Sequence, residues 1–126
     1  MPQSFTPGKN IAMKVPPHEF DQTVAFYRDV LGFEQLSAER GNPSPRFAFG
    51  DKVLWIDAVP GCTQAEIWLE VTTPNPAAAA AALAQAGVQR CDAVEPLPPG
   101  FNGYWITSPC NIVHLVSGTP DAAESS

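Results

Sequence analysis

The feature that most constrains the fold of this chain is an internal repeat of a strand and a helix. Residues 10–15 alternate apolar side chains with others in the manner of a half-buried strand, and residues 66–71 repeat that rhythm. Each segment is followed by a proline-containing break, a helical stretch and a glycine before a hydrophobe, Gly32 in the first copy and Gly87 in the second. Because the spacing between copies is nearly constant, the repeat predicts a pseudo-symmetric domain with a ligand site at its seam.

Turn residues divide each copy into a β-α-β-β-β module. In the first copy we expect strands over 9–15, 33–40, 46–49 and 52–58, with a helix over 18–31 that ends at Gly32. In the second copy we expect strands over 66–72, 88–93, 104–107 and 112–117, with an alanine-rich helix between Pro74 and Gly87. Residues 118–126 are expected to be a disordered tail.

Length and charge exclude several classes of protein. A chain of 126 residues with 44% hydrophobic and 16% charged residues is typical of one folded domain. A net charge of −6 argues against a nucleic-acid partner, and no apolar run is long enough for a membrane span. The three cysteines, Cys62, Cys91 and Cys110, have no paired spacing, so we expect reduced thiols in a cytoplasmic protein.

Two segments resemble the vicinal oxygen chelate superfamily, which includes glyoxalase I, extradiol dioxygenases and bleomycin-binding proteins. Residues 24–33 (VAFYRDVLGF) are similar to the family's helix-to-strand passage, and residues 108–116 are similar to its closing turn and strand. The resemblance covers roughly residues 9–117. It implies one α+β domain over 1–126, built from pseudo-symmetric modules at about 9–58 and 65–117, whose curled mixed sheets enclose a cavity.

Strand alternation predicts which side chains face that cavity. Ile11, Met13 and Val15 should pack under the first helix, and Ile67, Leu69 and Val71 under the second. On the other strands, Leu54, Ile56, Val113 and Leu115 should point to the core. The predicted cavity floor is then polar and aromatic, and it comprises Asn10, Lys14, Trp55, Asp57, Glu66, Trp68, Glu70 and His114.

The resemblance also implies positions for a metal. Metal-dependent relatives place one ligand on each of four strands, and those positions fall here on Asn10, Trp55, Glu66 and His114. Tryptophan cannot ligate, so Asp57, on the same face of its strand, is the substitute. The implied ligands of a divalent cation (zinc, nickel, manganese or iron) are therefore Asn10, Asp57, Glu66 and His114.

Two functions remain open at this point. The first is a glyoxalase- or dioxygenase-type enzyme, in which Glu66 or Glu70 moves a proton and Lys14, Arg46, Trp55 and Trp68 bind the substrate. The second is a metal-free protein, similar to the bleomycin-resistance members, that sequesters a planar or cationic small molecule. His114 could also be a hydrogen-bonded cavity residue that binds no metal. Relatives commonly pair, so we expect a homodimer.

Overall fold

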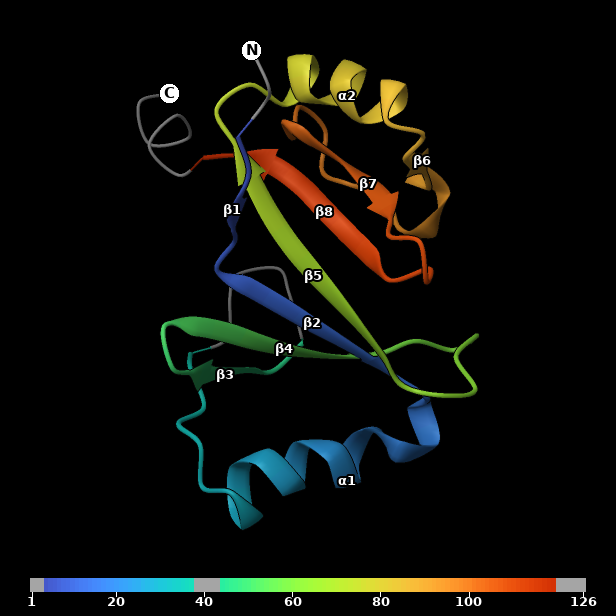
Figure 1. Ribbon diagram of the computed structural model, residues 1–126. Coiled ribbons are helices and arrows are strands. Elements are labelled where there is room, and N and C mark those ends of the chain that lie inside the picture. The colour runs from blue at the N-terminus through green and yellow to red at the C-terminus, as the bar shows by residue number, and fades with distance from the viewer. Residues whose placement is uncertain (1–3, 38–43, 120–126) are drawn as a thin grey trace. The chain divides into compact units, whose positions relative to one another are not determined.

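The computed structural model describes residues 4–37 and 44–119 and has an α+β fold. Its strands are connected by hydrogen bonds in one mixed path, β3-β4-β2-β5-β8-β7-β6, with β1 beside β5 (Figure 1). This confirms the expected α+β class. Within the described ranges, none of the helices has the length and apolar character needed to cross a bilayer.

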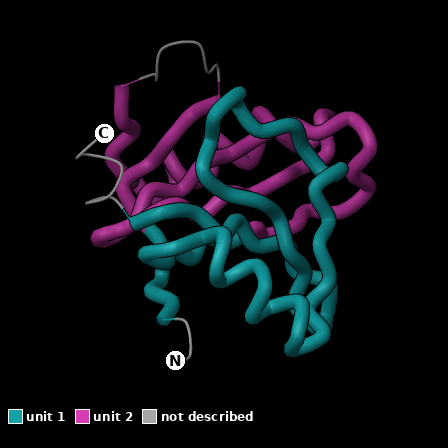
Figure 2. The backbone as a smooth tube through the Cα atoms, turned by 90° about the horizontal axis from the view of Figure 1, so that it is seen from above, with its two compact units in different colours: residues 1–8, 69–126 teal, residues 9–68 magenta. Residues whose placement is uncertain are grey.

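The chain divides into two compact units. Unit 1 comprises residues 1–8 and 69–126, and unit 2 comprises residues 9–68 (Figure 2). The boundary falls within β5 (Glu66–Thr73), so that Glu66 to Trp68 belong to unit 2 and Leu69 to Thr73 to unit 1.

Unit 2 is a sheet covered on one face by a helical segment. Its strands are β2 (Asn10–Val15), β3 (Arg46–Phe49), β4 (Lys52–Ala58) and the start of β5. Strand β2 is parallel to β4 and antiparallel to β5, and β3 is antiparallel to β4. The helical segment is a 3-10 turn (Pro17–Glu19), α1 (Phe20–Ala25) and a π-helical turn (Phe26–Val30). It stops at Gly32, whose φ of 70° favours glycine.

The core of unit 2 lies between α1 and the sheet. It is formed by the apolar positions of alternating strands together with the inner face of the helical segment, as the alternation predicts. The buried cluster is Val15, Val24, Phe47, Leu54 and Ile56, and Ile11, Met13, Phe20, Tyr27 and Phe33 pack against it.

Unit 1 repeats this topology with different side chains. Its elements are β1 (Thr6–Pro7), the rest of β5, α2 (Pro76–Gln85), β6 (Gln89–Arg90), a 3-10 turn (Asp92–Val94), β7 (Gly103–Thr107) and β8 (Val113–Gly118). Strand β5 is parallel to β8, and β7 is antiparallel to both β8 and β6. In each unit, therefore, the strand before the helix is parallel to a later strand (β2 to β4, and β5 to β8), and that later strand is antiparallel to the strand that precedes it (β3 or β7).

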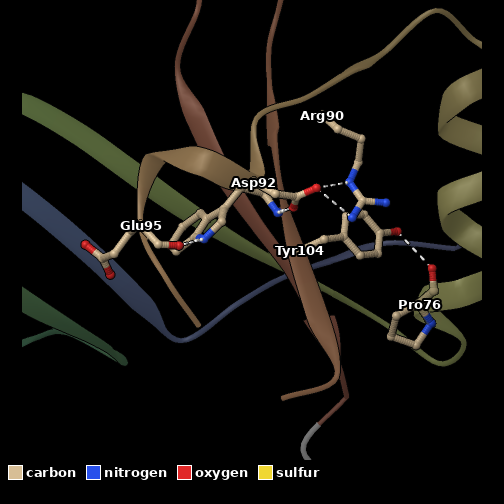
Figure 3. A network of polar contacts seen from close by, with 6 residues as sticks. Pro76, Arg90, Asp92, Glu95 and Tyr104 are labelled. Atoms are coloured by element: carbon tan, nitrogen blue, oxygen red, sulfur yellow. Dashed lines mark hydrogen bonds and ion pairs between the residues drawn. The ribbon is translucent and has the colours of Figure 1, made fainter. Parts of the chain in front are cut away.

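A polar network holds the segment after β6 against β7 (Figure 3). Arg90 pairs with Asp92 at 2.8 Å, and its guanidinium carbon lies 4.3 Å from the centre of the Tyr104 ring. The Tyr104 hydroxyl donates to the Pro76 carbonyl at 2.9 Å, which ties β7 to the start of α2. Burial raises the pKa of Tyr104, and burial likewise raises the pKa of Cys91.

In two of the predicted strands, a side chain replaces the neighbouring backbone as a hydrogen-bond partner, and the described strand is shorter than expected. The strand expected over 88–93 is only Gln89–Arg90, since the Asp92 carboxylate accepts the Trp105 N–H at 3.1 Å and the ladder ends there. Of the strand expected over 33–40, the described residues 33–37 form one bridge, at Gln35, and Arg46 donates to the Ser37 carbonyl.

Three further expectations differ from the structure or fall partly outside the residues that it describes. The helix expected over 18–31 is three short helical segments of different pitch rather than one α-helix. Strand β8 continues through Gly118, into the segment expected to be a tail. Residues 38–43 and 120–126, which include the rest of the expected strand and the rest of the expected tail, lie outside the described residues.

Candidate functional site

The face of the unit 2 sheet opposite α1 gathers most of the residues expected at the site. Neighbouring strands place their side chains in register, so residues paired across the sheet share a face. We call this surface the tryptophan face. Its members are Asn10, Ala12, Lys14, Arg46, Trp55, Asp57, Glu66 and Trp68.

The centre of the tryptophan face is Ala12, with a tryptophan on each side. Ala12 is the register partner of Trp55 on β4 and of Trp68 on β5. Adjacent strands are about 4.8 Å apart, so the two tryptophan Cα atoms are separated by roughly 10 Å across β2. Only a methyl group occupies the position between them. Alternation predicted that Ala12 and both tryptophans share one face, but the position of Ala12 between the two tryptophans depends on the pairing register.

Hydrogen bonds fix the two indoles in different directions. The Trp55 Nε1–H donates to Asn10 Oδ1 at 2.8 Å, toward the start of β2. The Trp68 Nε1–H donates to Glu66 Oε1 at 3.0 Å, toward the end of β2, where Glu66 is the register partner of Lys14. The two indole N–H groups therefore point toward opposite ends of β2.

A buried ion pair lies beside Ala12. Lys14 is only 3% exposed, and its Nζ is 2.7 Å from Asp57 Oδ2. The same ammonium group lies 4.3 Å from the centre of the Trp68 ring. A buried ammonium ion needs such partners, because the cost of removing it from water is otherwise uncompensated.

Arg46 at the edge of this face has a different environment. Its guanidinium carbon is 5.2 Å from the centre of the Trp55 ring, and it donates to the Ser37 carbonyl. Its Nε is buried with no hydrogen-bond partner. Among the described residues no carboxylate pairs with Arg46, so the guanidinium is the cation of this face best suited to an anionic ligand group.

In unit 1, the structure places His114 and Glu70 on opposite faces of the sheet. His114 pairs with Ile106, and both share the face of Tyr104, which bonds the start of α2. Glu70 pairs with Leu115 on the other face. The sequence predicted that Val113 and Leu115 point to the core and His114 to the cavity; Val113 is buried as predicted, but His114 lies on the face that α2 covers. Strand β8 carries buried residues on both faces (Val113 and Val116), so alternation could not distinguish them.

The residues present do not form a convincing metal site. Asn10 accepts from Trp55, Asp57 is paired with Lys14, and one oxygen of Glu66 accepts from Trp68. Across residues 4–37 and 44–119, no group of three or more His, Cys, Asp or Glu side chains is arranged to hold an ion. The four-ligand set implied by the resemblance thus does not fit this arrangement of donors.

Comparison with known proteins supports the fold at low sequence identity. No family model matches the sequence, and no curated protein matches it significantly. The structure is similar to the Mn(II)-bound glyoxalase from Novosphingobium aromaticivorans (TM-score 0.63, 22% identity), over 92% of this chain and 40% of that one. The chain therefore spans about two fifths of the length of that relative.

Two further structures extend the range of chemistries. Methylmalonyl-CoA epimerase from Mycobacterium tuberculosis matches with a TM-score of 0.58 and 15% identity, over 92% of this chain and 90% of that one. Homoprotocatechuate 2,3-dioxygenase from Arthrobacter globiformis matches with a TM-score of 0.59 and 17% identity, over 94% and 38%. The chain thus has the fold of the vicinal oxygen chelate superfamily, as its sequence indicated, and this fold serves several chemistries.

Proposed function

We propose that the tryptophan face binds a planar small molecule without the help of a metal ion. The observation that carries this proposal is the position of Ala12 between Trp55 and Trp68 in one row of the sheet. A separation of roughly 10 Å between strands two apart leaves room for one flat ring beside an indole. Stacking on an aromatic face is worth about 0.5–1.5 kcal/mol per ring pair beyond the area buried.

The polar groups of this face favour a ligand that carries a carboxylate. Lys14 is already paired with Asp57, whereas Arg46 has a buried Nε without a partner and lies over Trp55. A carboxylate on the ring would give the guanidinium a charge-assisted hydrogen bond, which is about twice as strong as a neutral one. Glu66, which is exposed, would instead favour a cationic ligand, so ligand charge must be tested directly.

Fluorescence titration tests this proposal. The chain has three tryptophans, and Trp105 is buried in unit 1, where it serves as an internal reference. Naphthalene-2-carboxylate should quench the emission of Trp55 and Trp68, with naphthalene and 2-naphthylmethylamine as neutral and cationic comparisons. We expect Arg46→Gln to remove the preference for the carboxylate.

Ala12→Leu is the decisive variant, because it places a larger side chain between the indoles. We expect it to abolish quenching by naphthalene-2-carboxylate while the exposed helix variant Ala81→Leu leaves quenching unchanged. If Ala12→Leu binds as the unaltered protein does, or if none of the three probes binds, the proposal is wrong.

The second candidate is a metal-dependent enzyme, and the likeness to the Mn(II)-bound glyoxalase favours it. Its ligands would come from Asn10, Asp57, Glu66 and His114, and Glu66 or Glu70 would carry a proton. Because the donors do not fit this role as they stand, we derive no reaction step from it. Tight stoichiometric Mn(II) binding that both Glu66→Ala and His114→Ala abolish would favour this candidate.

We also propose that the chain is a single domain of two modules and that it forms a homodimer. Sedimentation measurements across a hundredfold range of concentration test this directly. A species of about twice the chain mass at all concentrations supports a dimer, and the chain mass throughout contradicts it.

A further inference from the structure

The side chain of Asn10 joins two strands on the tryptophan face. Asn10 begins β2 and pairs in register with Val53 on β4, so Trp55, two residues further along β4, shares its face of the sheet. The Trp55 Nε1–H donates to Asn10 Oδ1 at 2.8 Å, at the short end of the usual range for such bonds. Because this contact spans 45 positions of the sequence, it depends on the folded sheet.

The chemistry of this contact is selective for one side of the amide. An indole N–H can only donate, so Asn10 must present its oxygen and not its NH₂ group. Leucine and aspartate have nearly the same shape as asparagine, but only aspartate offers an acceptor at this position. The contribution of the hydrogen bond can therefore be separated from that of the shape of the side chain.

The other neighbours of Trp55 in the sheet leave its ring free to turn. Its register partner on β2 is Ala12, whose methyl group is too small to confine an indole. Its partner on β3 is Arg46, whose guanidinium carbon lies 5.2 Å from the centre of the ring. A cation over the ring still allows the ring to rotate in its own plane. The bond to Asn10 restricts this remaining rotation.

Trp68 is held in a different way. Its acceptor, Glu66, lies two residues before it on the same strand and is exposed, so water competes for the bond. The buried Lys14 ammonium group also lies 4.3 Å from the centre of the Trp68 ring. Removing Glu66 should therefore disturb Trp68 less than removing Asn10 disturbs Trp55.

We propose that Asn10 is a positioning residue of the tryptophan face, whose side-chain oxygen holds the Trp55 indole in the orientation that stacks on a planar ligand. This inference rests on the proposed function, because it assigns a role within the same site. The oxygen of Asn10 that the resemblance assigned to a cation binds the indole instead. An indole fixed before the ligand arrives loses less conformational freedom on binding, which favours affinity.

Fluorescence titration of three variants tests this role. The probe is 2-naphthylmethanol, which is planar and neutral, because Asn10→Asp changes the charge of the face. Asn10→Leu should bind it roughly threefold to tenfold more weakly, as expected for one lost hydrogen bond, and Asn10→Asp should restore most of that loss. The matched control is Gln22→Leu, which replaces an exposed amide on α1 and should leave binding unchanged.

NMR of the protein without ligand gives a second readout. Asn10→Leu should speed the exchange of the Trp55 indole N–H with solvent, while the indole signals of Trp68 and Trp105 stay unchanged. Asn10→Asp should keep the slow exchange of Trp55. Asn10→Ala removes the same acceptor and replaces Asn10→Leu if that variant does not fold.

Three results would overturn the positioning role and leave the proposed function intact. These are undiminished binding by Asn10→Leu, equally weak binding by Asn10→Asp, and faster exchange of all three indoles, which would show that Asn10 only stabilises the fold. If the unaltered protein does not bind 2-naphthylmethanol, or if Ala12→Leu binds it equally well, the proposed function fails and this inference fails with it.

Discussion

The two units share one strand topology but fill the space under their helices in opposite ways. In unit 2 the helical segment contributes Phe20, Val24 and Tyr27 to a core built around Phe47. In unit 1 the corresponding helix is mostly alanine, and a hollow of about 200 Å³ lies beside its Leu83. The comparison shows that hydrogen-bond pairing of the strands defines the module, while the helix sequence decides how completely it is packed.

The largest effect should follow from truncating the unit 2 core. Phe47 is fully buried between α1 and the sheet. Phe47→Ala should lower the free energy of unfolding by about 3–5 kcal/mol, because the cavity cannot fully collapse. Urea denaturation followed by circular dichroism measures this.

Leu83→Ala is the matched truncation in unit 1. Its side chain already borders an open space, so its loss should cost clearly less than the loss of Phe47. Equal costs for the two variants would contradict the contrast between the units.

The next largest effect on stability should come from the Lys14–Asp57 ion pair of the tryptophan face. Asp57→Ala leaves Lys14 without its closest carboxylate and should destabilise the protein by roughly 3 kcal/mol. The double variant Lys14→Met, Asp57→Leu should recover most of that loss, since no buried charge remains. Asp29→Ala is the control, because its pair with Arg28 is exposed to solvent and should contribute little to stability. A cost for Asp57→Ala no larger than this control would show that Lys14 is solvated.

Adding one methylene to a side chain should change the free energy of unfolding in opposite directions in the two units. Val88→Ile extends into the unit 1 hollow and should stabilise the protein by about 0.5–1 kcal/mol. Val15→Ile enters the closely packed unit 2 core, where overpacking should cost about 1–3 kcal/mol. The melting temperatures of the two variants test this prediction. Shifts of both melting temperatures in the same direction would show that the packing of the units does not differ.

The smallest effect is a pH dependence that originates in unit 1. Burial raises the pKa of Tyr104 above its usual value of 10.0, so the folded state holds that proton more tightly than the unfolded chain. This contribution to stability is fully present below pH 10 and is lost as the pH rises through the raised pKa. Urea midpoints between pH 8 and pH 11 should fall less steeply for Tyr104→Phe than for the unaltered protein. Parallel curves would contradict a titrating Tyr104.

The sequence predicted the parts of the molecule that depend on local rules. Alternation on β2 and β4 correctly assigned Met13 and Ile56 to the core and left Lys14 and Trp55 on the other face, because each of these strands is apolar on one side. Glycine likewise marked the end of the first helical segment, at Gly32.

The features that the sequence did not predict depend on pairing between strands that are distant in the sequence. Strand β8 buries Val113 and Val116 on opposite faces, so the orientation of His114 could be read only from its register with Ile106. The importance of Ala12 depends in the same way on its two partner strands. Strand ends were missed where a side chain such as Asp92 takes a backbone donor.

The central claim is that a planar ligand lies over Ala12, between Trp55 and Trp68. Intermolecular nuclear Overhauser effects test it most directly, with labelled protein and naphthalene-2-carboxylate. The account predicts contacts from the ligand ring protons to the Ala12 methyl group and to at least one of the two indoles. Contacts confined to residues outside the tryptophan face, with none to Ala12, would contradict it.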